Sequence, residues 1–150
     1  MATAPFTSDS IVISAEPRQI FDILADPRRH SELDGSGTVR DTLFGPDRLS
    51  KGATFGMSMR MGVSYKITNK VIAFDPDTEI AWRHFGGHVW RYRLEPIDAQ
   101  RTRVVESWDC SPMKPTAQLV VRLVGFPRRT RRNITATLVR LKVLAEPIPR

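Results

Sequence analysis

The chain has 150 residues, a formal net charge of +7 and a single cysteine. This length suffices for one domain with a substantial hydrophobic core and is short for two, so we expect one domain over residues 1–150. No apolar run approaches the roughly 20 residues of a membrane-spanning helix, and the N-terminus lacks the basic and apolar stretches of a signal peptide. Because Cys110 is alone, an internal disulfide is excluded, and we expect a cytoplasmic protein.

The first predicted elements are a strand and two short helices. Residues 9–13 form a β-rich run, and Pro17 then opens a helix, because proline at the first helical position has no amide to leave unpaired. The pair Asp26-Pro27 ends this helix and caps a second short helix, which runs to about Leu33.

Residues 38–110 form a series of strands that are separated by turn-forming clusters. These clusters lie at residues 45–47, 75–77, 86–87 and 96–98. Consecutive strands with short turns predict an antiparallel meander. Its clearest alternation covers residues 55–61 and places four large apolar side chains on one face: Phe55, Met57, Met59 and Met61.

The turns test which strand residues share a face, because residues paired across a hairpin lie on the same side of the sheet. A three-residue loop at 85–87 pairs Trp82 with Trp90 and leaves a glycine free to take a positive φ. A two-residue turn would pair Trp82 with a residue of the opposite face, so we expect the longer loop. The same argument around Gly62 predicts two further pairs: Met59 with Tyr65, and Met57 with Ile67.

Beyond residue 111 the apolar spacing becomes helical. One stripe holds Leu119, Leu123 and Phe126, and another holds Ile134, Leu138 and Leu141. Pro127 removes one hydrogen bond and clashes with the preceding turn, so it should kink or interrupt the long helix near Gly125. We therefore expect helical pieces over about residues 114–126 and 128–145.

The positive charge is concentrated in this C-terminal segment. Residues 111–150 carry nine Lys or Arg and one acid, whereas the first 110 residues carry 14 basic and 15 acidic residues. The densest run contains Arg128, Arg129, Arg131 and Arg132, which could attract an acidic protein partner, an anionic membrane or nucleic acid. Nucleic acid is the weakest of these, because no aromatic or glycine residues are interleaved for base stacking. The simplest interpretation is the solvated face of a helix.

Five stretches carry a recognisable pattern: VISAEP at 12–17, IFDILADP at 20–27, IAWR at 80–83, WRYRLEP at 90–96 and TRVVESWD at 102–109. With the order strand, two short helices, meander and long helix, they resemble the START-like (SRPBCC) superfamily and its polyketide cyclase/dehydrase proteins. The resemblance implies an α+β helix-grip fold, in which about seven antiparallel strands curve around the C-terminal helix. It also implies a cavity for lipids, sterols or polyketides. One departure is Leu33, near which many members carry tryptophan.

The inward strand faces supply the candidate site residues. Methionine adapts its shape and aromatic rings offer flat surfaces, so an apolar ligand pocket is one interpretation and simple core packing is the other. The candidate ligand-binding residues are Phe55, Met57, Met59, Met61, Tyr65, Trp82, Trp90, Tyr92 and Trp108. The candidate acid–base residues are Tyr65, His84, His88, Tyr92 and Glu106, for which a satisfied hydrogen-bonding cluster is the alternative.

The motifs indicate neither a metal nor a cofactor. His84 and His88 face each other across a predicted hairpin, but no third ligand accompanies them. No phosphate-binding glycine loop, nucleophile elbow or CxxC pair is present in the sequence.

Three functional hypotheses remain. The leading one is binding or carrying of a small hydrophobic ligand such as a lipid or polyketide. The second is a polyketide cyclase or dehydratase that uses the acid–base residues of the cavity. The third is docking of an acidic partner on the basic C-terminal helix. A homodimer could form through an exposed strand edge or the apolar side of that helix.

Overall fold

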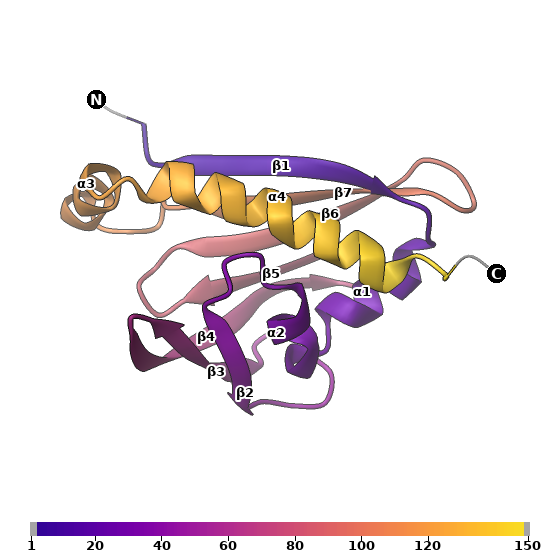
Figure 1. Cartoon of the computed structure of the whole chain (residues 1–150), viewed down its shortest axis with the longest axis horizontal. Helices are drawn as coiled ribbons and strands as arrows, with labels where there is room; N and C mark the ends of the chain where they lie inside the picture. Colours follow the sequence, from indigo (N-terminus) through magenta and orange to yellow (C-terminus); the bar gives the residue numbers. More distant parts are fainter. Residues whose placement is uncertain (1–2, 149–150) are drawn as a thin grey trace.

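The computed structural model describes residues 3–148 and shows an antiparallel sheet that curves around a long helix, α4 (Figure 1). Seven strands occur in the order β1-β7-β6-β5-β4-β3-β2 across the sheet. Their bounds are β1 (Phe6–Ile13), β2 (Val39–Phe44), β3 (Thr54–Met61), β4 (Val63–Asp75), β5 (Glu79–His84), β6 (Val89–Pro96) and β7 (Thr102–Asp109). This arrangement confirms the predicted α+β helix-grip fold.

Three short helical segments follow β1: α1 (Pro17–Leu24), the 3-10 helix η1 (Pro27–Arg29) and α2 (His30–Leu33). Glu16 and Gln19 form a capping box at the start of α1, which satisfies amides that the first helical turn leaves free. Asp26 accepts the Arg28 N–H at 3.0 Å and caps η1, as the sequence predicted. β1 begins at Phe6, three residues before the predicted start, because its pairing with β7 extends to Phe6 opposite Asp109.

The predicted hairpin registers are confirmed. Trp82 pairs with Trp90 across β5 and β6, and the loop between them has Gly87 at φ 102°. Across β3 and β4, Met59 pairs with Tyr65 and Met57 with Ile67, and Gly62 at the tip has φ 75°. Large apolar side chains from four strands therefore face the same concave side of the sheet.

The C-terminal segment forms two helices, α3 (Pro115–Leu123) and α4 (Phe126–Ala145). The interruption lies near Gly125 as predicted, and Gly125 adopts φ 74° there. Pro127 lies in the first turn of α4, where its missing amide is not needed, so α4 begins two residues before the predicted start of 128. It ends at residue 145 as predicted, whereas α3 begins one residue later and ends three residues earlier than the predicted 114–126.

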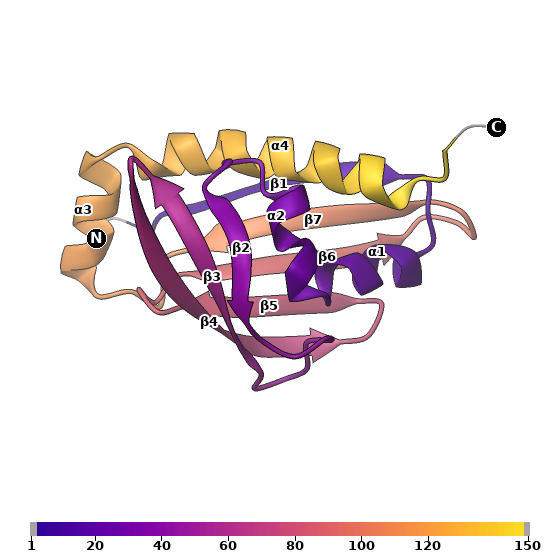
Figure 2. The ribbon, with the colours of Figure 1, turned by 60° about the horizontal axis from the view of Figure 1, so that its bottom comes forward.

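The predicted stripe of Leu119, Leu123 and Phe126 does not act as one packing surface. Only Phe126 packs against the core, whereas Leu119 is 54% exposed and Leu123 is 77% exposed. The reason is positional, because α3 lies at the end of the molecule rather than across the sheet, as the rotated view shows (Figure 2).

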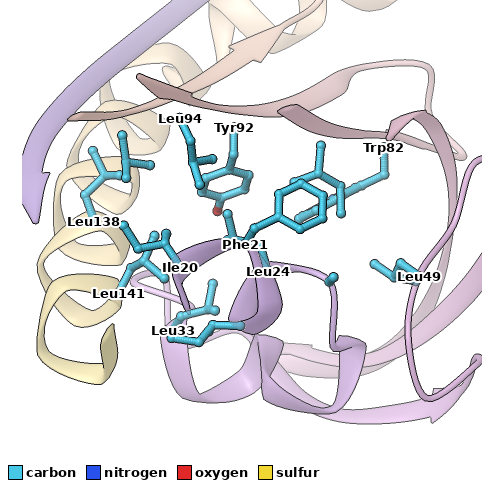
Figure 3. Close-up of a cluster of buried hydrophobic side chains, with 14 of the residues drawn as sticks. Ile20, Phe21, Leu24, Leu33, Leu49, Trp82, Tyr92, Leu94, Leu138 and Leu141 are labelled. Atoms are coloured by element: carbon cyan, nitrogen blue, oxygen red, sulfur yellow. The ribbon is translucent and has the colours of Figure 1, made fainter. Parts of the chain in front are cut away.

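The main core fills the space beneath the C-terminal half of α4. Ile20 and Phe21 of α1 lie near Leu94 of β6 and near Leu138 and Leu141 of α4 (Figure 3). All five are at most 3% exposed, and burial of each side chain stabilises the fold by roughly 1.5–3 kcal/mol.

Gly35, which follows α2, fixes the loop there against α4. Its N–H donates to Thr137 Oγ1 at 2.8 Å, and a Cβ at this position would overlap the backbone of Asn133 and Thr137. The core and this close contact together hold α4 above the sheet, and the space beneath the first half of α4 is left for a cavity.

Candidate functional site

A cavity of about 310 Å³ lies between the sheet and the N-terminal half of α4. All nine candidate ligand-binding residues line it: Phe55, Met57, Met59, Met61, Tyr65, Trp82, Trp90, Tyr92 and Trp108. Met61 and Tyr65 are 38% and 36% exposed, so they form part of its rim, while Trp108 is almost fully buried. This volume is at the lower end of the range for pockets that hold drug-sized molecules. Contact of these residues with a ligand remains a prediction.

One wall of the cavity is a stack of aromatic rings around His30. The His30 ring stacks on Trp82 with 4.9 Å between ring centroids, and it meets Phe55 edge-on at 5.3 Å. His30 Nε2 lies 2.9 Å from the Leu24 carbonyl oxygen, so the neutral ring carries its proton on Nε2. Burial lowers the pKa of His30, which keeps the ring uncharged. Sequence reasoning missed His30, because it comes from α2 rather than from an alternating strand.

His84 and His88 lie together at the β5–β6 turn and also line the cavity. Their rings are stacked with 4.3 Å between centroids, and the Gly86 N–H donates to His84 Nδ1 at 2.9 Å. Burial lowers the pKa of His84 to about 4. Burial and the neighbouring His84 lower the pKa of His88 to about 3. Both rings are therefore neutral near pH 7, where they can donate or accept hydrogen bonds but act as weak bases.

Tyr92 and Glu106 form a buried polar pair in the cavity wall. Tyr92 donates its hydroxyl hydrogen to Glu106 Oε1 at 2.8 Å, and Glu106 is only 2% exposed. Burial is the main cause that raises the pKa of Glu106 to about 8; Asp34 and Asp9 raise it further, and the Tyr92 hydrogen bond opposes the rise. Burial and the adjacent Glu106 raise the pKa of Tyr92 as well. Near neutral pH the Glu106 carboxyl is therefore mostly protonated.

Two buried side-chain oxygen atoms among residues 3–148 have no hydrogen-bond partner, Glu106 Oε2 and Asn69 Oδ1. Both residues line the cavity. Buried polar atoms are normally satisfied, and an orphaned one costs about 1–3 kcal/mol. The protonated Glu106 can donate a hydrogen bond through Oε2, whereas the Asn69 amide oxygen can only accept one. The cavity thus offers one unused donor and one unused acceptor beside its apolar and aromatic lining residues.

The loop at the end of α2 forms another side of the cavity. The Asp34 carboxylate accepts hydrogen bonds from the backbone amides of Ser36, Thr38 and Val39 at 2.9–3.1 Å. Arg140 of α4 donates to the Asp34 carbonyl oxygen at 2.8 Å, which ties this loop to the helix. Leu33 and Asp34 line the cavity directly.

Helix α4 contributes a row of side chains that sequence reasoning did not select. Thr130, Asn133, Ile134 and Thr137 line the cavity, together with Phe126 and Arg129 at the start of the helix. The spacing of Thr130 and Thr137 from Ile134 places them on one helical face, and this signal was available from the sequence. Arg128, Arg131 and Arg132 of the basic run are exposed and lie outside the cavity lining.

No group of three or more His, Cys, Asp or Glu side chains within residues 3–148 is placed to hold a metal ion. Over the same residues no helix is both long and apolar enough to span a membrane.

The fold and the cavity define a helix-grip protein with a pocket of ligand size beneath its long helix. Residues 7–146 match the family described as polyketide cyclase/dehydrase and lipid transport, and the chain belongs to this family. The family supports a role in binding or cyclising a ligand without distinguishing the two, and binding of a small hydrophobic ligand fits its description.

Among curated proteins the chain is similar to the uncharacterised protein Rv0088 of Mycobacterium tuberculosis. The two are 37% identical over 137 residues, which cover 89% of this chain and 61% of that protein. The chain thus spans about three fifths of the length of the curated relatives it matches.

Solved structures confirm the fold at low sequence identity. The protein CV1439 of Chromobacterium violaceum is 17% identical with a TM-score of 0.74, over 95% of this chain and 99% of that one. The Zhui aromatase/cyclase of Streptomyces sp. R1128 is 15% identical with a TM-score of 0.65, over 91% and 93% of the two chains.

Proposed function

We propose that the protein binds a small, uncharged hydrophobic ligand, such as a lipid or a polyketide, in the cavity beneath α4. The observation that carries this proposal is an apolar, aromatic and methionine-rich cavity that contains two unpartnered buried oxygens, Glu106 Oε2 and Asn69 Oδ1. An interior that was only packed core would be expected to leave neither such a volume nor orphaned polar atoms.

The chemistry of the lining favours a neutral ligand with a few polar atoms. His30, His84, His88 and Glu106 are all uncharged near pH 7, so the part of the cavity that they line offers no counter-charge to an ionised group. The charged lining residues are Asp34, whose carboxylate already accepts three backbone amides, and Arg129, which is exposed at the start of α4. A ligand carbonyl or ether oxygen would accept a hydrogen bond from the protonated Glu106, and a ligand hydroxyl or N–H would donate one to Asn69 Oδ1. The flat rings of Trp82, Trp90 and Trp108 suit an aromatic or polyene body.

Tryptophan fluorescence tests this proposal directly, because all three tryptophans of the chain line the cavity. We expect the neutral apolar probe N-phenylnaphthylamine to quench them and to become fluorescent itself. The variant Asn133→Phe places a ring in the cavity from α4 and should weaken binding at least about tenfold, since it occupies ligand volume. Val139→Phe, at a 50% exposed position of the same helix, is the matched control. The proposal fails if wild type and Asn133→Phe respond equally to the probe.

A second candidate function is acid–base catalysis of a cyclisation or dehydration within the same cavity. The observation that favours it is the Glu106 carboxyl, whose pKa of about 8 lets it donate a proton near neutral pH. Tyr92, which donates to it, and Tyr65, His84 and His88 are the other candidate residues. A synthetic poly-β-ketone thioester is the assay substrate.

The variant Glu106→Gln separates the two functions. The amide retains a donor and an acceptor in place of the carboxyl but cannot exchange the proton, so probe affinity should change little. If the protein is an enzyme, turnover of the thioester should fall by about 10²–10⁴-fold, the usual contribution of a general acid. Turnover that is absent in the wild type would leave ligand binding as the function, and turnover that is unchanged in the variant would exclude Glu106 as the general acid.

A further inference from the structure

Helix α3 presents an apolar surface that nothing in residues 3–148 covers. Leu119, Val120, Leu123 and Val124 are 54%, 58%, 77% and 60% exposed, and α3 contains no buried residue. Apolar stripes of surface helices normally face a core, and contiguous exposed apolar patches mark interaction sites. The four residues are called the α3 patch below.

The α3 patch lies at the same end of the molecule as the β3–β4 tip, which carries the exposed cavity-lining residues Met61 and Tyr65. Figure 2 shows α3 beside the N-terminal end of α4 and the tips of the β3–β4 and β5–β6 hairpins. Met113, just before α3, lies close to Gly87 of the β5–β6 turn. Each hairpin tip adds an exposed apolar residue, Val63 at 73% and Phe85 at 71%. Phe126, two residues beyond the patch, already lines the cavity.

The charged residues of the chain segment that carries the α3 patch have one sign. Residues 111–145 contain eight Lys or Arg and no acidic residue. Six of these cations flank the patch along the chain and take part in none of the salt bridges formed within residues 3–148: Lys114, Arg122, Arg128, Arg129, Arg131 and Arg132. Unpaired cations beside exposed aliphatic side chains are the features by which interfacial helices bind anionic membranes.

We propose that the α3 patch and its six cations dock on the surface of an anionic phospholipid bilayer. The aliphatic side chains enter the boundary between headgroups and acyl chains, while the cations meet lipid phosphates. This inference rests on the proposed function, because docking at this end would let an apolar ligand pass between bilayer and cavity with little exposure to water.

Charge argues against a second copy of the chain as the occupant of this surface. Another α3 patch would bring the same cluster of cations, and like charges brought face to face repel. An acidic protein could satisfy the cations, but it would also need an apolar surface shaped to α3, whereas a bilayer supplies anionic and apolar layers at fixed depths.

Co-sedimentation with vesicles tests the proposal. Wild type should partition onto vesicles of equal phosphatidylglycerol and phosphatidylcholine and remain in solution with phosphatidylcholine alone. The double variant Leu119→Ser, Leu123→Ser should lose about tenfold or more in partition, because exposed leucines contribute to insertion and not to the core. The double variant Arg128→Gln, Arg131→Gln should lose about tenfold, since each cation near an anionic surface contributes on the order of a few-fold in affinity.

Matched controls lie elsewhere on the surface. Val143→Ser changes an exposed apolar residue at the far end of α4, and Arg83→Gln with Arg103→Gln changes two exposed sheet cations; all should partition like wild type. Retention of vesicle binding by the leucine variant would overturn the proposal and leave simple charge adsorption. Binding to immobilised polyglutamate but not to vesicles would assign the surface to an acidic protein, and a dimer that the leucine variant dissociates would assign it to a second copy.

Membrane docking and the proposed ligand binding can be refuted separately. Binding of N-phenylnaphthylamine in solution, without vesicles, reports on the cavity alone. Probe binding without vesicle association would therefore refute membrane docking and leave ligand binding intact.

Discussion

The substitution Glu106→Gln should alter the pH dependence of folding in a way that reports how deeply this carboxyl is buried. Glu106 is 2% exposed, and burial raises its pKa from an ordinary value of 4.5 to about 8. Gln has nearly the same shape and can still accept the Tyr92 hydroxyl hydrogen, so the hydrogen bond of 2.8 Å can persist. What the substitution removes is the proton that the folded state retains and the unfolded state releases.

The direction of the pH effect on stability follows from the pKa of Glu106 in the folded protein and in the unfolded chain. Between pH 4.5 and about 8 the folded protein holds a proton on Glu106 that the unfolded chain has lost. The stability that this proton provides is fully present below the unfolded pKa and is lost as the pH rises through the folded pKa. The free energy of unfolding should therefore fall by about 1.4 kcal/mol for each pH unit in this window, on the order of 5 kcal/mol in all.

The half-buried histidines His84 and His88 act in the opposite direction at lower pH. Their folded pKa values of about 4 for His84 and about 3 for His88 lie below the ordinary 6.5, so the stability they provide is present above 6.5 and lost as the pH falls through those values. Wild type and Glu106→Gln share these histidines, so the difference between the two proteins isolates Glu106.

Urea unfolding of both proteins at a series of pH values from about 5 to about 9 measures this difference. The stability of wild type relative to Glu106→Gln should decrease by about 3 kcal/mol between about pH 5.5 and about pH 7.5. A difference that stays constant across this range would refute the reasoning, because it would mean that Glu106 has an ordinary pKa and is in contact with water.

Three further substitutions test the fold and the site by urea unfolding. Gly35→Ala should lower the free energy of unfolding by about 1–3 kcal/mol, because the new methyl group overlaps the α4 backbone. Stability equal to that of wild type would contradict this contact. Leu138→Ala should cost about 2–5 kcal/mol, against less than about 0.5 kcal/mol for the exposed control Val139→Ala; similar losses would count against the burial pattern. Tyr92→Phe should cost about 1–3 kcal/mol by leaving Glu106 Oε1 unpartnered, and no loss would mean that water reaches the pair.

Strand pairing could be predicted because its determinants are local. A period of two places Trp82 and Trp90 on one face only if the loop between them has three residues, and the pairing of these two residues confirms that choice. The same rule could have found Asn69, which lies two residues beyond Ile67 on β4 and lines the cavity. Asn69 did not stand out in the sequence because its side chain is neither apolar nor titratable.

Helical periodicity was less informative, because it identifies an apolar stripe without identifying what covers it. The spacing of Ile134, Leu138 and Leu141 and that of Leu119 and Leu123 are equivalent in the sequence. The first set is buried because α4 lies across the sheet, whereas the second is exposed because α3 lies beyond it. That difference depends on the tertiary position of each helix.

The electrostatic character of the site also depends on tertiary structure. The sequence singled out His84, His88, Tyr92 and Glu106 as titratable groups on the concave side, and they line the cavity. Their protonation states depend on how deeply each group is buried. Alternation along a strand shows which face a residue is on but not how deeply it is buried. His30 illustrates the same limit, because the packing of α2 alone brings its ring against Trp82.

The most direct test of the account is a crystal structure of the protein grown with N-phenylnaphthylamine. The account predicts electron density for the probe between the first half of α4 and the sheet, in contact with Trp82, Trp90 and Trp108 and with its N–H toward Asn69. A collapsed interior, or a probe found only on the outer surface, would contradict the claim that this fold encloses a hydrophobic binding site.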